Sequence, residues 1–137
     1  MITANSYQDI QIMQNADFEN IISFDAATYD VNDYNYKALI AKDRKATDFT
    51  YNGVPSSGVF FTITKNSNGA ISQTITLKLT ASQTSKFEDD FEGVWDLIVQ
   101  DAQVTSSYVR EFEGDVVVSP SVSRITDAGD FTEDTQE

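Results

Sequence analysis

Acidic side chains are the residues of this sequence best suited to chemistry, because hard cations bind several converging oxygen ligands. They gather in two segments predicted to be loops, which hold Asp25, Asp30 and Asp33 in the first, and Glu88, Asp89, Asp90 and Glu92 in the second. Neither segment has the ligand spacing of a twelve-residue helical calcium loop. Because 22 of the 137 residues are acidic, some clustering is expected by chance. We therefore interpret both segments as solvated acidic loops.

Two carboxylates facing each other across a cleft would perform glycoside hydrolysis. Asp96 and Asp101 flank one predicted strand, but the sequence does not indicate a cleft between them. Histidine and cysteine are both absent, which excludes Ser-His-Asp catalysis, Cys-His catalysis and a zinc site. Neither glycine-rich phosphate-binding motif occurs in the chain, so nucleotide chemistry is rejected. We expect no catalytic residue, no metal, no cofactor and no enzyme activity.

Exposed aromatic side chains would offer a stacking platform for sugars. The chain has nine Phe, six Tyr and one Trp. Trp95 lies in the most apolar predicted strand and is assigned to the core, whereas Tyr29, Tyr34 and Tyr51 lie near loops and are expected to be more exposed. A carbohydrate- or ligand-binding module, assisted by calcium, is therefore the alternative function. It predicts a thermal shift when calcium or glycans are added.

Strands must position all of these groups, because alternation of apolar and polar residues with a period of two dominates the chain. The predicted strands cover residues 7–13, 18–25, 34–42, 59–64, 71–79, 94–100 and 107–119. The fourth and fifth are expected to form a hairpin around the turn residues 66–69. Residues 81–85 are expected to form a single capped helical turn. Seven or eight strands with closely spaced turns favour a sandwich or a small barrel.

The last predicted strand carries two residues with positional meaning. Gly114 sits inside it and suggests a bulge or a bend, and Pro120 is expected to end it. The side chains of Tyr108, Phe112, Val116 and Val118 share one parity and are expected to share one face. We predict one sandwich domain over residues 1–125, followed by an acidic tail over residues 126–137 that is flexible or a docking arm.

Three segments are predicted to be contact surfaces, because loops at the ends of a sandwich usually make contacts. They are the loops 45–58 and 87–93 and the segment 125–137. The candidate interaction residues are Tyr51, Asn52, Pro55, Glu88, Asp89, Asp90, Glu92, Asp127, Asp130 and Phe131.

The net charge of −13 restricts the classes of molecule that the protein is expected to bind. Binding to nucleic acid or to an anionic membrane needs basic residues, so both are disfavoured. A basic protein partner fits the charge, although the charge also serves solubility alone. The start of the chain has no basic and apolar pattern of a signal peptide, and no apolar stretch reaches the roughly 20 residues of a bilayer span. We expect synthesis in the cytoplasm.

The order of motifs in the carboxyl half resembles a family of small structural proteins of tailed phages and prophages. The motifs are Leu-Lys-Leu-Thr-Ala-Ser-Gln-Thr at 77–84, Val-Trp-Asp-Leu at 94–97, Asp101, Arg-Glu-Phe-Glu-Gly at 110–114 and Val-Val-Val-Ser-Pro-Ser-Val-Ser-Arg at 116–124. The resemblance covers roughly residues 7–125 and is looser in the amino half. Ser123 replaces the usual Thr, Asn15 replaces the usual Gly, and residues 41–57 have no counterpart.

This family is similar in kind to the Ig-like amino-terminal domains of baseplate adaptor proteins. The resemblance implies an all-β, Ig-like antiparallel β-sandwich of about seven to eight strands. It further implies a virion component of the tail, baseplate or fibre that contacts other virion proteins in a symmetric assembly. Neck or capsid decoration is the alternative location. No catalytic residue is implied.

Overall fold

Residues 6–43 and 49–120 are described by the structure, a computed structural model. Their elements in chain order are β1 (Ser6–Tyr7), β2 (Ile10–Met13), β3 (Phe18–Phe24), η1 (Val31–Asp33), β4 (Tyr34–Ala41), β5 (Phe49–Tyr51), β6 (Val54–Ser56), β7 (Val59–Phe60), β8 (Thr62–Asn68), β9 (Ser72–Leu79), α1 (Ala81–Thr84), β10 (Glu92–Asp101) and β11 (Tyr108–Ser119). The all-β prediction is confirmed, but the described residues hold eleven strands instead of seven or eight.

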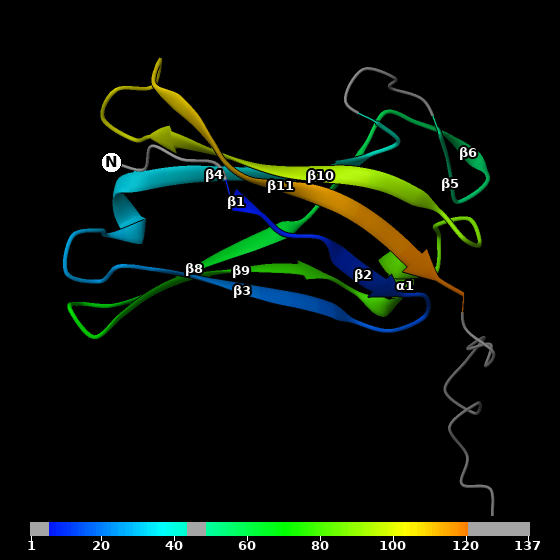
Figure 1. The fold of residues 1–137 in the computed structure, drawn as a ribbon, viewed down its shortest axis with the longest axis horizontal. Helices are drawn as coiled ribbons and strands as arrows, with labels where there is room; N and C mark the ends of the chain where they lie inside the picture. The colour runs from blue at the N-terminus through cyan, green and yellow to red at the C-terminus, as the bar shows by residue number, and fades with distance from the viewer. Residues whose placement is uncertain (1–5, 44–48, 121–137) are drawn as a thin grey trace, which may run out of the picture.

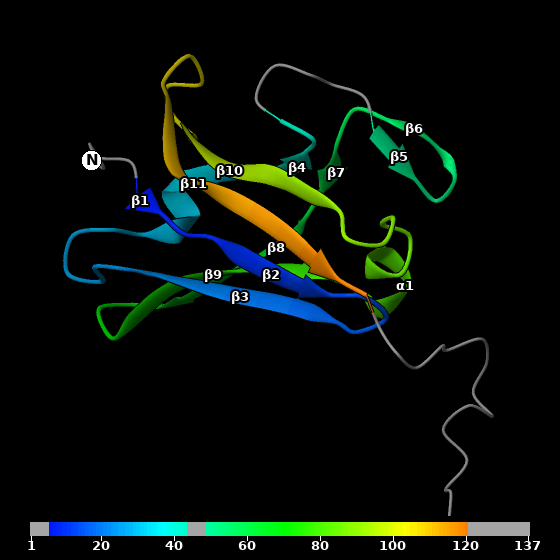
Figure 2. The same ribbon diagram turned by 45° about the vertical axis from the view of Figure 1, so that its right-hand side comes forward.

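Two sheets form the layers of the sandwich (Figure 1). The larger sheet has the order β1-β11-β10-β4-β7, with β2 also paired to β11, and the smaller has the order β3-β9-β8. A separate two-stranded sheet of β5 and β6 lies at one end (Figure 2). The strands β3, β4, β8, β9, β10 and β11 take the places of strands B to G in an immunoglobulin constant-type sandwich, with B, E and D in one sheet and C, F and G in the other.

The core between the sheets is built from the residues that alternation assigns inward. The most buried of each predicted set are Ile12, Ile22, Ala38, Ile40, Ile75, Leu77, Leu79, Trp95, Leu97, Val99, Val116 and Val118. The assignment of Trp95 to the core is confirmed, since it is 1% exposed. The predicted helical turn is also confirmed: Thr80 caps α1 by accepting the N–H of Gln83, whose side chain accepts the N–H of Thr80 in return.

The amino-terminal strand differs from the prediction in direction and continuity. β1 and β2 both pair with β11 in parallel, so the larger sheet is mixed, whereas the other strand pairs of the described residues are antiparallel as predicted. The strand is interrupted between β1 and β2, where the carbonyl of Gln8 accepts the Trp95 indole N–H at 2.7 Å. A side chain on Gly114 would lie closer than 3.0 Å to that carbonyl. Gly114 therefore permits a close backbone approach.

The bulge in β11 lies at Glu111, three residues before the glycine for which it was predicted. Leu97 pairs with Phe112 and Ile98 pairs with Arg110, so Glu111 is the extra residue. An extra residue reverses the alternation of a strand. For this reason Tyr108, which was predicted to share the inward face of the later valines, is instead 62% exposed.

The predicted hairpin over residues 59–79 is confirmed with two changes. Val59 and Phe60 form β7, which pairs with β4 in the larger sheet, and the chain then crosses to the smaller sheet as β8. The turn also begins later in the chain than predicted, because residues 66–68 still belong to β8. Gly69 with φ of 56° begins the turn, which is the left-handed conformation that glycine adopts without cost.

Candidate functional site

The predicted contact loop 45–58 contains a small hairpin formed by β5 and β6. Asn52 and Gly53 make its turn, with φ angles of 56° and 76°. Two-residue hairpin turns with positive φ at both positions strongly favour this pair of residues. The predicted contact residue Pro55 lies in β6 opposite Thr50 and is exposed. The long loop is therefore an ordered projection within the residues that the structure describes.

Tyr51 fixes this hairpin to the chain that follows α1. Its ring lies edge-on to Phe87 with centroids 5.0 Å apart, and its hydroxyl donates to the carbonyl of Gln83 at 2.8 Å. The backbone N–H of Asn52 donates to the carbonyl of Lys86 at 2.8 Å. Partial burial raises the pKa of the Tyr51 hydroxyl, so it remains a donor throughout the neutral range. Tyr51 is thus an anchor, and Asn52 is the exposed tip.

The predicted acidic loop lies directly beside the hairpin. Phe87 and Phe91 are buried at its two ends with ring centroids 5.1 Å apart, and Phe49 of β5 lies 5.0 Å from Phe91. These rings hold the backbone while the charged side chains between and after them face solvent. The exposed acids are Glu88, Asp89, Asp90 and Glu92, the last of which is already the first residue of β10.

Two of the three predicted contact segments therefore form one surface, residues 49–56 with 86–92, which we call the hairpin end. Figures 1 and 2 both place it at the end of the sandwich where β11 stops. The N–H of Val118 donates to the carbonyl of Phe91 at 2.9 Å, which ties β11 to this surface. The third segment, 125–137, with Asp127, Asp130 and Phe131, lies outside the described residues.

Gln14 joins the turn after β2 to the same surface. Its side-chain amide donates to the carbonyl of Phe87 and to the carboxylate of Asp89, each at 3.0 Å. These two bonds hold the first half of the acidic loop against the sandwich. The loop is therefore positioned by side chains from a distant part of the sequence.

Four of the carboxylates considered for calcium or for glycoside hydrolysis are used in local structure. Asp25 accepts the N–H of the residue two positions later, and so does Asp30, which are turns that aspartate commonly makes. Asp101 accepts two N–H groups of the following turn, and Asp96 lies 3.6 Å from Arg110. In the described part of the chain, no three acidic residues gather as a metal site would require.

Tyr29, which was expected to be exposed, is buried, so that expectation is wrong. Its ring stacks between Phe24 at 4.2 Å and Tyr34 at 4.7 Å, and its hydroxyl lies 2.9 Å from that of Tyr36. Burial raises the pKa of Tyr29 far above its usual value and that of Tyr36 to about 12. The loop before η1 folds inward because the N–H of Val31 donates to the buried Gln73. Tyr34, like Tyr51, is half-buried.

Glu111 is a buried acid that sequence reasoning missed. It is 5% exposed, and its Oε2 atom has no hydrogen-bond partner within the described residues. Burial raises the pKa of its carboxyl group. A signal was present in the sequence, because the run 110–113 places charged residues on both parities of one strand. Because successive side chains of a strand point to opposite faces, at least one of these charged residues must face the interior.

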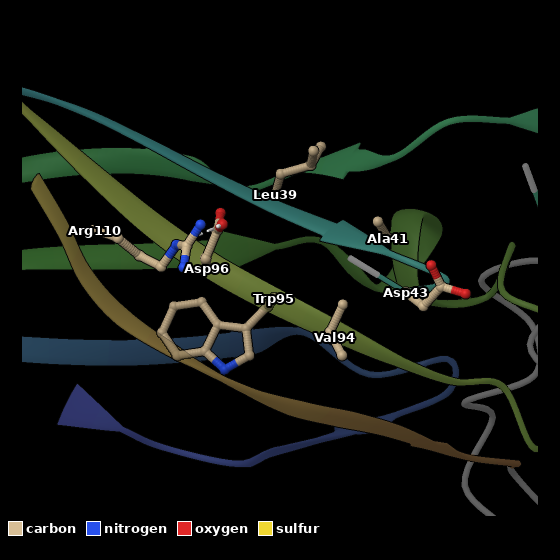
Figure 3. A pocket seen from close by; sticks show the side chains of 7 residues that line it. All are labelled: Leu39, Ala41, Asp43, Val94, Trp95, Asp96 and Arg110. Carbon is tan, nitrogen blue, oxygen red and sulfur yellow. Dashed lines mark ion pairs between the residues drawn. The ribbon is translucent and has the colours of Figure 1, made fainter. Parts of the chain in front are cut away.

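The larger sheet also has an outward face with mixed apolar and charged side chains, which we call the outer face. It is formed by Lys37, Leu39, Ala41, Phe60, Val94, Asp96, Ile98, Tyr108, Arg110, Asp115 and Val117. A hollow of about 140 Å³ lies in it, lined by Leu39, Ala41, Asp43, Val94, Trp95, Asp96 and Arg110 (Figure 3). Arg110 lies 3.6 Å from Asp96 and 3.9 Å from Glu113. Pockets for small molecules usually have about 300–1,000 Å³, so this hollow has the size for one side chain of a partner.

No family model and no curated protein matches this chain. None of the helices in the described residues has the length and apolar character that crossing a membrane requires. The strongest features for function are therefore the two surfaces, the hairpin end and the outer face.

Proposed function

We propose that the protein is a structural component of a tailed-phage virion, an adaptor of the tail, baseplate or fibre that binds other virion proteins through its hairpin end. The observation that supports this is the joining of two predicted contact segments, far apart in the sequence, into one ordered surface. Exposed loops on a rigid sandwich are well suited to recognition. The phage assignment itself rests on the motif resemblance over residues 7–125.

The composition of the hairpin end indicates the kind of partner. Val54 is 56% exposed next to the exposed Pro55, and the exposed acids of the neighbouring loop belong to the same surface. Protein interfaces usually combine an apolar centre with a polar rim. An acidic rim speeds association with a basic surface and disfavours an acidic one. The partner of the hairpin end is therefore a different, basic virion protein, because the hairpin end of another copy carries the same exposed acids.

Assembly of particles with variant chains tests this proposal. Val54→Asp and Glu88→Lys each alter the hairpin end at an exposed side chain, and both are expected to lower incorporation into particles, measured by quantitative mass spectrometry. Glu19→Lys makes the same charge change on exposed β3 and serves as the control. Absence of the wild-type protein from intact particles would refute the proposal, and so would full incorporation of both hairpin-end variants.

The same measurement separates the tail from other locations. Copy number per particle follows the symmetry of the surrounding structure. A few copies per particle support a baseplate or fibre position, whereas a number that matches the capsid lattice supports capsid decoration.

A further inference from the structure

The outer face carries more apolar surface than a solvated sheet face requires. Outward positions of an antiparallel pair that faces water are usually polar. Here Phe60 is 52% exposed, Tyr108 62% and Val117 43%, and Val94 and Ile98 are partly exposed between them. Exposed apolar patches of this kind mark interaction sites.

The strand register places one outward residue each of β4, β10 and β11 side by side, and we call each such row across the strands a level. Read along the strands, the levels are Lys37–Ile98–Arg110, then Leu39–Asp96–Glu113, then Ala41–Val94–Asp115. The first level carries two positive charges, and the other two carry only negative ones. The charge of the outer face therefore changes sign along the strand direction, from basic at one end to acidic at the other.

A second copy of the chain is complementary to this arrangement. In a face-to-face pair, a two-fold axis that lies in the interface and crosses the strands at the middle level reverses the order of the levels. Arg110 of each copy then faces Asp115 of the other, and Ile98 faces Val94 and the hollow beside it. Phe60 and Leu39 meet their own equivalents near the axis. Asp96 and the buried Glu113 also meet their equivalents there, and both lie within 4 Å of Arg110 of their own chain.

The area of the face suits a modest dimer. The strands of the larger sheet hold 38 residues among the described ones. At about 4.8 Å between strands and about 3.4 Å per residue, they cover roughly 600 Å² per copy. The total of roughly 1,200 Å² lies at the lower end of specific interfaces. We propose that two copies of this chain associate through their outer faces as a weak, transient dimer.

Paired substitutions at the facing positions test this dimer. Val94→Lys faces the level that carries Lys37 and Arg110 of the other copy, and Ile98→Asp faces the level that carries Asp115. Each single variant therefore places a charge opposite an apolar side chain and beside charges of the same sign, and is expected to weaken association by at least tenfold, a change of about 1.4 kcal/mol. The double variant places the new carboxylate of one copy opposite the new ammonium group of the other, twice per dimer, and is expected to restore association. Within one chain the two positions are about 14 Å apart along β10, so they interact directly only across the interface.

Sedimentation equilibrium of the full chain from about 1 to 100 µM gives the dissociation constants. Ile21→Lys is the control, because Ile21 is 58% exposed on the smaller sheet, and it is expected to dimerise like the wild type. Thermal unfolding of each variant confirms that it is folded. A wild type that is monomeric at about 100 µM refutes the dimer, as does a single variant that still dimerises or a double variant that stays monomeric. None of these outcomes affects the hairpin-end proposal, whose variants lie elsewhere.

Salt provides a second readout for the dimer. Each copy carries a net charge of −13, and the repulsion between two copies is screened when ionic strength rises. Association through the outer face is therefore expected to strengthen as salt increases from about 20 to 200 mM. Binding that weakens over this range would show that attraction between charges drives association, which contradicts an apolar interface.

Discussion

Removing the charge of Glu111 is expected to stabilise the protein at neutral pH. The carboxyl group is 5% exposed, and Oε2 has no hydrogen-bond partner in the described residues. Burial raises its pKa, so the folded protein binds this proton more tightly than the unfolded chain, in which glutamate titrates near 4.3. The stability that protonation contributes is fully present below the unfolded pKa and is lost as pH rises through the raised pKa. At pH 7, above the pKa of the unfolded chain, burial of this carboxyl group therefore destabilises the fold.

The size of the effect follows from the difference between burying an unpaired charge and burying the neutral amide that replaces it, which is about 1–3 kcal/mol. Glu111→Gln keeps the shape of the side chain and removes the charge. It is expected to raise the free energy of unfolding by about 1–3 kcal/mol at pH 7, or Tm by roughly 3–9 °C for a chain of this size. Below about pH 4 both side chains are neutral and the difference is expected to vanish.

Urea unfolding followed by tryptophan fluorescence measures this difference, because Trp95 is the sole tryptophan and is buried. Glu19→Gln is the control, since it removes one charge from an exposed strand position and reports only the relief of general repulsion. A Glu111→Gln protein that is less stable than wild type at pH 7 would refute the reasoning. A stability gain that does not depend on pH would do the same, because it would not arise from the charge.

Two further substitutions test contacts that position the strands and the hairpin end. Gly114→Ala is expected to lower the free energy of unfolding by about 1–3 kcal/mol, because the new methyl group would overlap the carbonyl of Gln8; a red shift of Trp95 fluorescence would report loss of the bond to that carbonyl, and an unchanged urea midpoint would contradict the close approach. Tyr51→Phe removes the bond to α1 and is expected to cost about 1 kcal/mol and to speed hydrogen exchange at the Asn52 amide. Unchanged exchange would show that this hydroxyl does not hold the hairpin.

The inward faces of the strands were predictable because they depend on local alternation. Ile75, Leu77 and Leu79 alternate with polar residues in the sequence and are all fully buried. Trp95 and Leu97 follow the same rule on β10. A side-chain period of two is a property of the strand itself, so it requires no knowledge of the partner strand.

The pairing of strands was less predictable, because it depends on residues far apart in the chain. The parallel pairing of β2 with β11 joins Ile10 to Val116, and nothing in either segment specifies the other. The bulge at Glu111 arises from a mismatch between β10 and β11. One inserted residue then changed the outcome for Tyr108, although the alternation after it, at Val116 and Val118, was read correctly.

The predicted contact segments contain one feature that the local sequence predicts and one that depends on residues far apart in the chain. The Asn52–Gly53 pair is a strong hairpin signal, so the hairpin in the loop 45–58 could have been predicted from the sequence. Its position beside Phe87 could not, since this depends on the backbone bond from Asn52 to Lys86 and on the ring contact of Tyr51. The burial of Tyr29 likewise depends on stacking partners from two other segments.

The two proposed surfaces have a joint consequence for assembly. A two-fold axis that crosses the strands reverses their direction in the second copy, so the two hairpin ends of such a dimer point to opposite sides. Each copy could then bind one basic partner, and the dimer would bridge two of them, which is how an adaptor connects parts of a symmetric structure. The two contacts respond to salt in opposite directions, because screening weakens attraction to a basic partner and relieves repulsion between acidic copies. A salt titration of the complete assembly therefore tells which contact holds it together.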